Sequence, residues 1–292
     1  MLKTPTAGLP RFYFNRATRI WIPYFLAVAA VLLLSLLRKE FSAKWLEIAA
    51  YQLTFVYNLF GTPQLEQFRN AMPLQGTGHH FWSINAEEQF YLLAPLLLTP
   101  LLGRWGRHPV LWLALAVLTW YLNFYQSIVF GVAAAALCQH WGIERLSLTI
   151  RTFAACCAVA ALSAIVLGYS YNHWVAFMGI GVVLAFSTQG PEHRIGQFLG
   201  GMSYPLYLNH WMGAFVANGL LTPWGLRESI AKTVLATAAA LVIGALAYVL
   251  VDRNIARYRN RYYTDNLGMG LLAASFALMS IGLTLGWYWQ HP

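Results

Sequence analysis

Apolar segments of membrane-spanning length recur along most of the chain, from Ile20 to Trp289. About 20 consecutive apolar residues suffice to cross the ~30 Å hydrocarbon core of a bilayer as a helix. Only 10% of the residues are charged, whereas soluble domains contain about 25%. The sequence therefore predicts an all-α fold, a polytopic transmembrane helix bundle that leaves no room for a soluble domain.

The apolar runs predict about nine spans and one helix that does not cross. The spans are expected at residues 20–37, 83–102, 110–124, 127–141, 152–169, 174–187, 204–221, 230–251 and 267–289. Residues 45–60 are short for a span and contain polar side chains, so they are expected to form a re-entrant or interfacial helix. Residues 110–141 could instead form one bent helix, although its length at ~1.5 Å per residue would overshoot the bilayer core.

The net charge of +9 is explained by the loops of such a bundle. With the N-terminus inside and the spans alternating, thirteen of the 19 Lys and Arg residues fall on the inner side and six on the outer side. Cytoplasmic loops of membrane proteins carry such an excess. We therefore expect a cytoplasmic N-terminus and an external C-terminus, and no nucleic acid as a partner.

Residues 79–91 place two histidines and two glutamates at the mouth of an apolar run. At helical spacing Ser83, Glu87 and Tyr91 form one polar stripe, and Glu88 lies about 100° away from it. An ionised carboxylate near mid-bilayer costs roughly 2.5–3.5 kcal/mol, so Glu87 should face the protein interior and have a partner. This favours Glu87 over Glu88 as the functional carboxylate. The alternative is that both lie in a first helical turn and offset the helix macrodipole.

Arg16 and Arg19 stand three residues apart directly before the first span, on one face of a helix. They could anchor that span at the inner surface, as basic residues commonly do. They could also grip phosphate groups, because the guanidinium fork binds them in a bidentate manner. The sequence leaves both interpretations open.

A second polar stripe lies in the span predicted at residues 204–221. Ser203, Tyr207 and His210 fall on one narrow face of a helix, which lipid exposure explains poorly. The alternative to a functional role is a buried hydrogen-bond network that fixes helix packing. No metal site is expected, because His79, His80 and the two glutamates lack the His-Glu-x-x-His spacing.

These three places resemble motifs of the integral-membrane acyltransferase 3 family, which includes O-acetyltransferases of bacterial surface glycans. Residues 82–91 resemble Trp-Ser-Leu-x-x-Glu-x-x-Phe-Tyr, with Ile84 in place of the usual Leu. Residues 16–24 resemble Arg-x-x-Arg-Ile-x-Pro-x-Tyr, with Ile22 where Pro is common. Residues 203–210 resemble Ser-Tyr-x-Leu-Tyr-Leu-x-His. Asp252 stands where the family usually has Glu-x-Pro, and Asn254 replaces the Pro.

The resemblance implies transfer of an acyl group, acetyl above all, from acetyl-CoA to a hydroxyl of a glycan or lipid-linked saccharide. The protein would lie among the lipids of the bacterial cytoplasmic membrane, with no bound cofactor beyond the acyl-CoA donor. Arg16 and Arg19 would hold the phosphates of the donor. Glu87 and His210 would be catalytic, with Glu87 as a base or as the orienting partner of a histidine. Ser83, Tyr91, Ser203 and Tyr207 would form the polar stripes of the core.

The resemblance also exposes a difference. Family members have two spans before the arginine motif, and the first carries the histidine regarded as catalytic, whereas no histidine of this chain precedes His79. We therefore expect residues 1–292 to form a single acyltransferase-like domain that is N-terminally incomplete relative to the family, with 267–289 as an extra C-terminal span. A non-enzymatic permease or subunit, or an inactive paralogue, is the alternative, because paired glutamates in a bundle also suit proton coupling.

Depth estimates from the predicted spans separate Glu87 from His210. His210 lies ~10 Å from the inner edge of its span and Glu87 ~6 Å from the outer edge of its own. Across a ~30 Å core this leaves roughly 14 Å between them, too far for a catalytic dyad. The estimate places His79 and His80 in the outer loop as the nearest imidazoles to Glu87, and we expect that the chain alone does not catalyse transfer.

Overall fold

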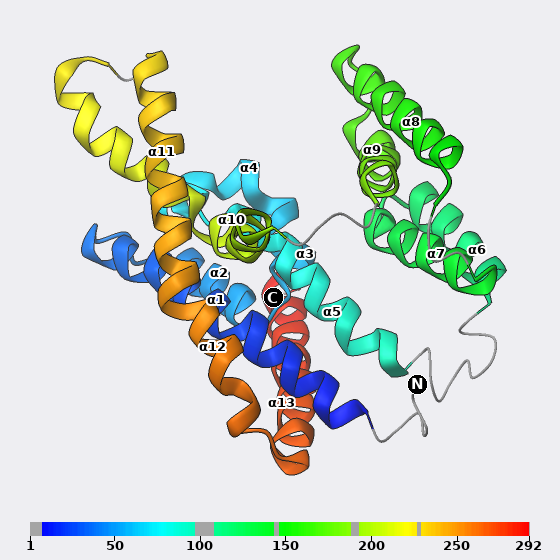
Figure 1. Cartoon of the computed structure of the whole chain (residues 1–292). Helices are drawn as coiled ribbons and strands as arrows, with labels where there is room; N and C mark the ends of the chain where they lie inside the picture. Colours follow the sequence, from blue (N-terminus) through cyan, green and yellow to red (C-terminus); the bar gives the residue numbers. More distant parts are fainter. Residues whose placement is uncertain (1–7, 97–107, 143–145, 188–192, 227–228, 292) are drawn as a thin grey trace. The chain divides into compact units, whose positions relative to one another are not determined.

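The computed structural model describes residues 8–96, 108–142, 146–187, 193–226 and 229–291, and every regular element among them is helical (Figure 1). The prediction of an all-α fold is confirmed. The chain divides into two compact units, one made of Met1–Leu92 with Glu192–Pro292 and the other of Leu93–Pro191. The expectation that residues 1–292 act as one domain stays a prediction.

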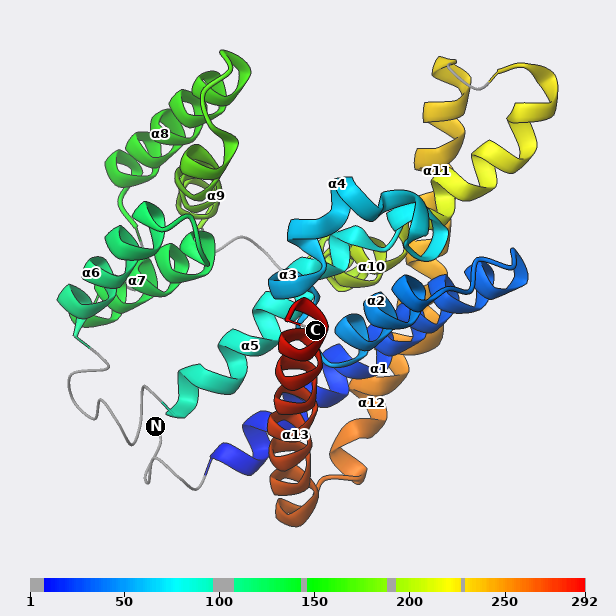
Figure 2. The same cartoon turned by 180° about the vertical axis from the view of Figure 1, so that it is seen from behind.

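The first unit contains the long helices of the bundle and a run of short helical turns. Its elements are α1 (Leu9–Leu37), α2 (Ala43–Leu53), α3 (Tyr57–Phe60), η1 (Thr62–Gln64), α4 (Leu65–Phe68), η2 (Arg69–Ala71), η3 (Pro73–Gly76), η4 (His79–Phe81), α5 (Trp82–Leu96), α10 (Arg194–Leu221), η7 (Thr222–Trp224), α11 (Ile230–Ala247), the π-helical turn η8 (Tyr248–Asp252), α12 (Arg253–Tyr258), η9 (Arg259–Arg261) and α13 (Asp265–Gln290). Figure 2 shows α13 beside α1. Gly268 of α13 permits this close approach, because a Cβ atom there would overlap the backbone of Pro10.

Four helices of the described residues are long and apolar enough to cross a membrane: Leu9–Leu37, Leu148–Val166, Ile230–Arg261 and Asp265–Gln290. Pro109–Tyr121 and Tyr171–Phe186 are apolar but shorter. The number of nine spans therefore stays a prediction.

Two helices begin well before the predicted spans. α1 starts at Leu9 rather than near residue 20, with Pro10 in its first turn, and α10 starts at Arg194 rather than near residue 204. Proline suits the first turn of a helix, where its missing N–H is not needed. Arg and Gln are good helix formers, so polar residues end the apolar run without ending the helix.

Residues 45–60 form two helices, α2 and α3, rather than one. Phe55 lies between them with a left-handed φ of 58°, and its ring stacks on Tyr24 of α1. Ser42 caps α2 by accepting a hydrogen bond from the backbone N–H of Trp45. At 1.5 Å per residue α2 is about 16 Å long, which is too short to span a bilayer.

The second unit contains α6 (Pro109–Tyr121), α7 (Gln126–His140), α8 (Leu148–Val166) and α9 (Tyr171–Phe186). Asn123 and Tyr125 have left-handed φ values of 52° and 57° in the turn between α6 and α7. Two such residues reverse the chain. The alternative of one bent helix over residues 110–141 is therefore wrong.

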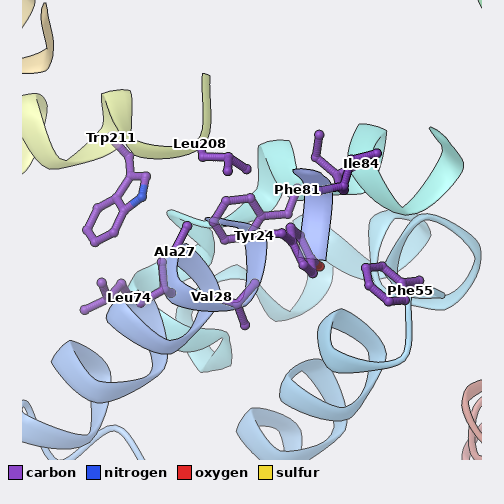
Figure 3. Packing of buried hydrophobic residues seen from close by; sticks show 11 residues of the cluster. Tyr24, Ala27, Val28, Phe55, Leu74, Phe81, Ile84, Leu208 and Trp211 are labelled. Atoms are coloured by element: carbon purple, nitrogen blue, oxygen red, sulfur yellow. The ribbon is translucent and has the colours of Figure 1, made fainter. Parts of the chain in front are cut away.

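The core of the first unit brings together α1, α5, α10 and the turn at Phe55 (Figure 3). Tyr24 is fully buried at its centre. Its hydroxyl donates to the carbonyl of Gln52 at 2.8 Å and accepts from Asn85 Nδ2 at 2.9 Å. Both hydrogen-bonding capacities of the phenol are thus used, as a group buried away from water requires.

We predict that alanine at two glycines of α10 has opposite effects on stability. A Cβ atom at Gly213 would overlap the backbone of Ala236 and Ala240 on α11, whereas at Gly219 it would meet nothing within 4 Å. Gly213→Ala should destabilise the protein by about 1–3 kcal/mol through overpacking. Gly219→Ala should stabilise it by up to about 1 kcal/mol through helix propensity. Unfolding temperatures of the purified protein in detergent measure both, and equal shifts would contradict the α10–α11 contact.

Candidate active site

Four polar contacts join α1 to α5, and from the first to the last of them α5 runs antiparallel to α1. Near the N-terminal end of α1, Tyr13 Oη donates a hydrogen bond to Leu92 O at 3.0 Å. Further along α1, Arg16 forms a salt bridge with Glu87, and Trp21 donates a hydrogen bond to Glu88. Tyr24 and Asn85 form the fourth contact. Because Tyr24 lies near the middle of α1, the first turn of α5 begins deep inside the bundle.

Arg16 contacts two of the three residues of the predicted stripe, Glu87 and Tyr91. Its Nη2 atom lies 3.4 Å from Glu87 Oε1, and its guanidinium lies 3.0 Å from the ring centroid of Tyr91. Glu87 therefore has the cationic partner that its position in an apolar helix requires, although its side chain stays 37% exposed. α5 begins at Trp82 and has no acidic residue in its first turn, so the macrodipole alternative for Glu87 and Glu88 is excluded.

Glu88 faces α1 from its own side of α5 and is only 6% exposed. Trp21 Nε1 donates to its Oε2 atom at 2.9 Å. Its Oε1 atom and Arg16 Nε are both buried and have no hydrogen-bond partner among the described residues. Both residues line a cavity of about 10 Å³, together with Trp21 and Ser275. That volume holds one water molecule, which could accept from Arg16 and donate to Glu88.

Ser83 and Tyr207 join α5 to α10. Tyr207 Oη lies 2.6 Å from the carbonyl oxygen of His80 and 2.5 Å from Ser83 Oγ. A carbonyl only accepts, so the phenol donates to His80 and accepts from the hydroxyl of Ser83. The two predicted stripes therefore meet, at Ser83 of one and Tyr207 of the other.

His210 packs against His80, with ring centroids 4.6 Å apart. His210 Nδ1 lies 2.8 Å from the carbonyl of Tyr207 in its own helix. Nδ1 therefore carries a proton, and in the neutral ring Nε2 keeps a lone pair. His80 Nε2 donates to the carbonyl of Leu208 at 3.3 Å. Burial, followed by the nearby His210, lowers the pKa of His80, so this imidazole is neutral at pH 7.

The contact between His80 and His210 shows that the depth estimate was wrong. It placed His80 in an outer loop and His210 near the inner edge, yet the rings touch. Because α10 begins at Arg194, His210 lies about 24 Å into its helix at 1.5 Å per residue, rather than ~10 Å. The turn η4 folds inward, since Phe81 is fully buried against Tyr24.

Three candidate groups lie apart from these contacts. Ser203 is exposed and donates to Gly200 O in its own helix at 2.8 Å. Arg19 is exposed and interacts electrostatically with Glu87 and Asp252. His79 Nδ1 lies 3.1 Å from Tyr57 Oη. Within the described residues, no group of three His, Cys, Asp or Glu side chains could hold a metal ion.

Sequence reasoning missed Glu88 and the pairing of His80 with His210. A helical wheel separates Glu88 from the stripe and cannot show that its own face meets α1. The sequence contained a weak indication of this contact, because a carboxylate such as Glu88 in an apolar helix needs a partner whichever face of the helix it lies on.

Comparisons with known proteins identify the family of the chain. The profile of the acyltransferase 3 domain matches residues 1–249 of the chain. The chain belongs to this family. It is also 28% identical over 299 residues to a protein of Komagataeibacter xylinus whose name proposes a membrane-bound transacylase, BcsY; the match covers 91% of this chain and 74% of that protein. No solved structure matches. The chain is therefore a membrane acyltransferase.

We predict that Glu88 and Arg16 act as one unit. Glu88→Gln and Arg16→Gln should each lower the unfolding free energy by about 1–3 kcal/mol, because each leaves a buried charged group short of a partner. The double variant should cost less than the sum by at least about 0.5 kcal/mol. Chemical or thermal unfolding in detergent of the wild type, the two single variants and the double variant measures this double-mutant cycle.

Glu47→Gln provides the control, because Glu47 is also a partly buried carboxylate but pairs with Lys44 and Tyr51. Its effect should add to that of Arg16→Gln. Additive effects of Glu88→Gln and Arg16→Gln would show that the two side chains are independent.

Proposed function

We propose that this membrane acyltransferase moves an acetyl group from acetyl-CoA to a hydroxyl of a cell-surface glycan or lipid-linked saccharide. It would do so in the bacterial cytoplasmic membrane, with its N-terminus in the cytoplasm and its C-terminus outside. The observation that carries the proposal is a set of polar side chains along α5 of an apolar bundle. The exposed His210 packs against His80, Ser83 contacts Tyr207, and Glu87, one helical turn further along, pairs with Arg16. Polar side chains within a membrane raise the free energy of the fold, and such residues are therefore a default indication of a functional site.

His210 is the proposed general base. Its Nδ1–H is held by the carbonyl of Tyr207, which leaves Nε2 to take the proton of the acceptor hydroxyl. The hydroxyl oxygen then forms a bond to the thioester carbonyl carbon, and the carbon–sulfur bond breaks. The CoA thiolate leaves and takes up the proton from His210. His80 is neutral and packs beside His210, so it does not oppose the positive charge that His210 gains in this step.

Arg16 and Arg19 have different proposed roles. Arg16 is held by Glu87 and Tyr91, so it fixes the carboxylate of Glu87 in place. Arg19 is exposed, and its fork can reach a donor phosphate. The donor grip expected of both arginines thus falls mainly to Arg19. Glu87, one helical turn from Ser83, orients this set of side chains rather than meeting His210 directly.

We expect His210→Gln to lower the rate of acyl transfer by about 10²–10⁴-fold. Glutamine has a similar size and can form hydrogen bonds, but it cannot act as a base. His291→Gln is the control, since His291 lies exposed in the C-terminal tail against Trp287. Release of CoA thiol from acetyl-CoA, with glycan acceptors present, measures the rate.

The same assay tests whether these 292 residues catalyse transfer alone. If these residues show no acyl transfer, the variants are compared in an upstream-extended form of the protein. An unchanged rate for His210→Gln at equal protein level would refute its role as the base.

Lysine at the two arginines should separate their roles, because it keeps the charge but removes the fork. Arg19→Lys should raise the KM for the donor about tenfold with little change in kcat, and Arg16→Lys should mainly lower kcat. Steady-state kinetics with varied acetyl-CoA measures both. An unchanged donor KM in both variants would mean that the arginines only anchor the span.

A further inference from the structure

The segment that follows η8 concentrates arginine and tyrosine at one end of the bundle. Residues 253–263 contain four arginines and three tyrosines, namely Arg253, Arg257, Arg259, Arg261, Tyr258, Tyr262 and Tyr263, and no acidic residue. Most of these side chains are exposed, with Tyr262 at 70% and Tyr258 at 37%. The carboxylates that flank the segment are Asp252 and Asp265, and Asp265 accepts a hydrogen bond from Tyr263. The surface therefore carries a large excess of positive charge.

The arginines of this surface are ordered by aromatic rings rather than by carboxylates. The guanidinium groups of Arg257 and Arg261 each lie 5.3 Å from the ring centroid of Tyr258. A contact between a cation and an aromatic face holds the guanidinium without neutralising it. Both forks thus keep their full charge and their N–H donors for an external anion.

The segment is fixed beside the start of α1. Arg11 Nη2 donates to Asn260 Oδ1 at 3.1 Å, and its guanidinium lies 4.5 Å from the ring centroid of Tyr263. Tyr263 also packs edge-on against Phe14. Arg19 follows Arg11 on the same helix at about 12 Å, by 1.5 Å per residue. The helix that carries Arg11 beside this surface therefore also carries Arg16, which pairs with Glu87, and Arg19.

We propose that this surface, and above all Arg257, Tyr258 and Arg261, binds the phosphorylated adenosine end of the acyl-CoA donor. The inference rests on the proposed function and adds the place where the donor is held. A nucleotide with several phosphates matches several forks at once, and tyrosine and arginine planes stack on a purine base. The excess of arginine in cytoplasmic loops explains the charge but not the contact of two guanidinium groups with the same tyrosine ring. The thioester arm would then extend along α1 to His210.

The test uses the purified chain in nanodiscs of uncharged phosphatidylcholine, with adenosine 3′,5′-bisphosphate as the probe. Arg257→Gln with Arg261→Gln should weaken binding about 100-fold, because each charge-assisted contact contributes about tenfold or more. Tyr258→Leu, which keeps both charges, should weaken it about tenfold through lost stacking. Arg194→Gln is the control, since Arg194 is an exposed arginine at the start of α10. Unchanged affinity in the double variant would overturn the proposal.

Anionic lipid headgroups share the phosphate chemistry, so a second arm adds phosphatidylglycerol to the nanodiscs. The proposal expects bisphosphate binding to persist, with a modest loss from competition. Binding of phosphatidylglycerol that depends on Arg257 and Arg261, with no detectable binding of the bisphosphate, would make this a lipid site and overturn the proposal.

A third arm separates this inference from the proposed function. The double variant should raise the KM for acetyl-CoA but not the KM for acetyl-pantetheine, which lacks the nucleotide. Nucleotide binding that depends on the arginines, without any acyl transfer, would support the site and refute the donor role. Acyl transfer with normal nucleotide affinity in the double variant would refute the site alone.

Discussion

The antiparallel contact between α1 and α5 determines where the polar groups of this protein can lie. In an apolar bundle an unpaired carboxylate or guanidinium is costly, and removal of one partner of a buried pair destabilises strongly. Arg16 with Glu87 and Trp21 with Glu88 satisfy this constraint only at one alignment of the two helices. Sliding α5 by one turn would break both contacts together.

That alignment also places the histidines. Once Asn85 meets Tyr24 at the middle of α1, the residues just before α5 must lie in the interior. His80 then reaches α10, where the hydroxyl of Tyr207 donates a hydrogen bond to the His80 carbonyl. His80 just before α5 and Glu87, about two helical turns further along, are thus positioned by the same helix.

The sequence alone predicts the helical fold, the family and the face shared by Ser83, Glu87 and Tyr91, since these follow from local periodicity. It does not predict Glu88 against Trp21 or His80 against His210, because these depend on which helix meets which face. Helix starts at Leu9 and Arg194 were misjudged for a different reason, namely that polar residues end an apolar run but not a helix.

The distribution of charge along α1 suits a donor with a charged head and an apolar reactive arm. At the N-terminal end of α1, Arg11 and the nearby Arg257 and Arg261 contact aromatic rings and keep their charge. Further in, Arg16 is offset by Glu87, and beyond this pair lie imidazole and hydroxyl groups. Phosphates would therefore be held where the positive charge is uncompensated. Only an uncharged thioester could advance without the cost of carrying charge into the bundle.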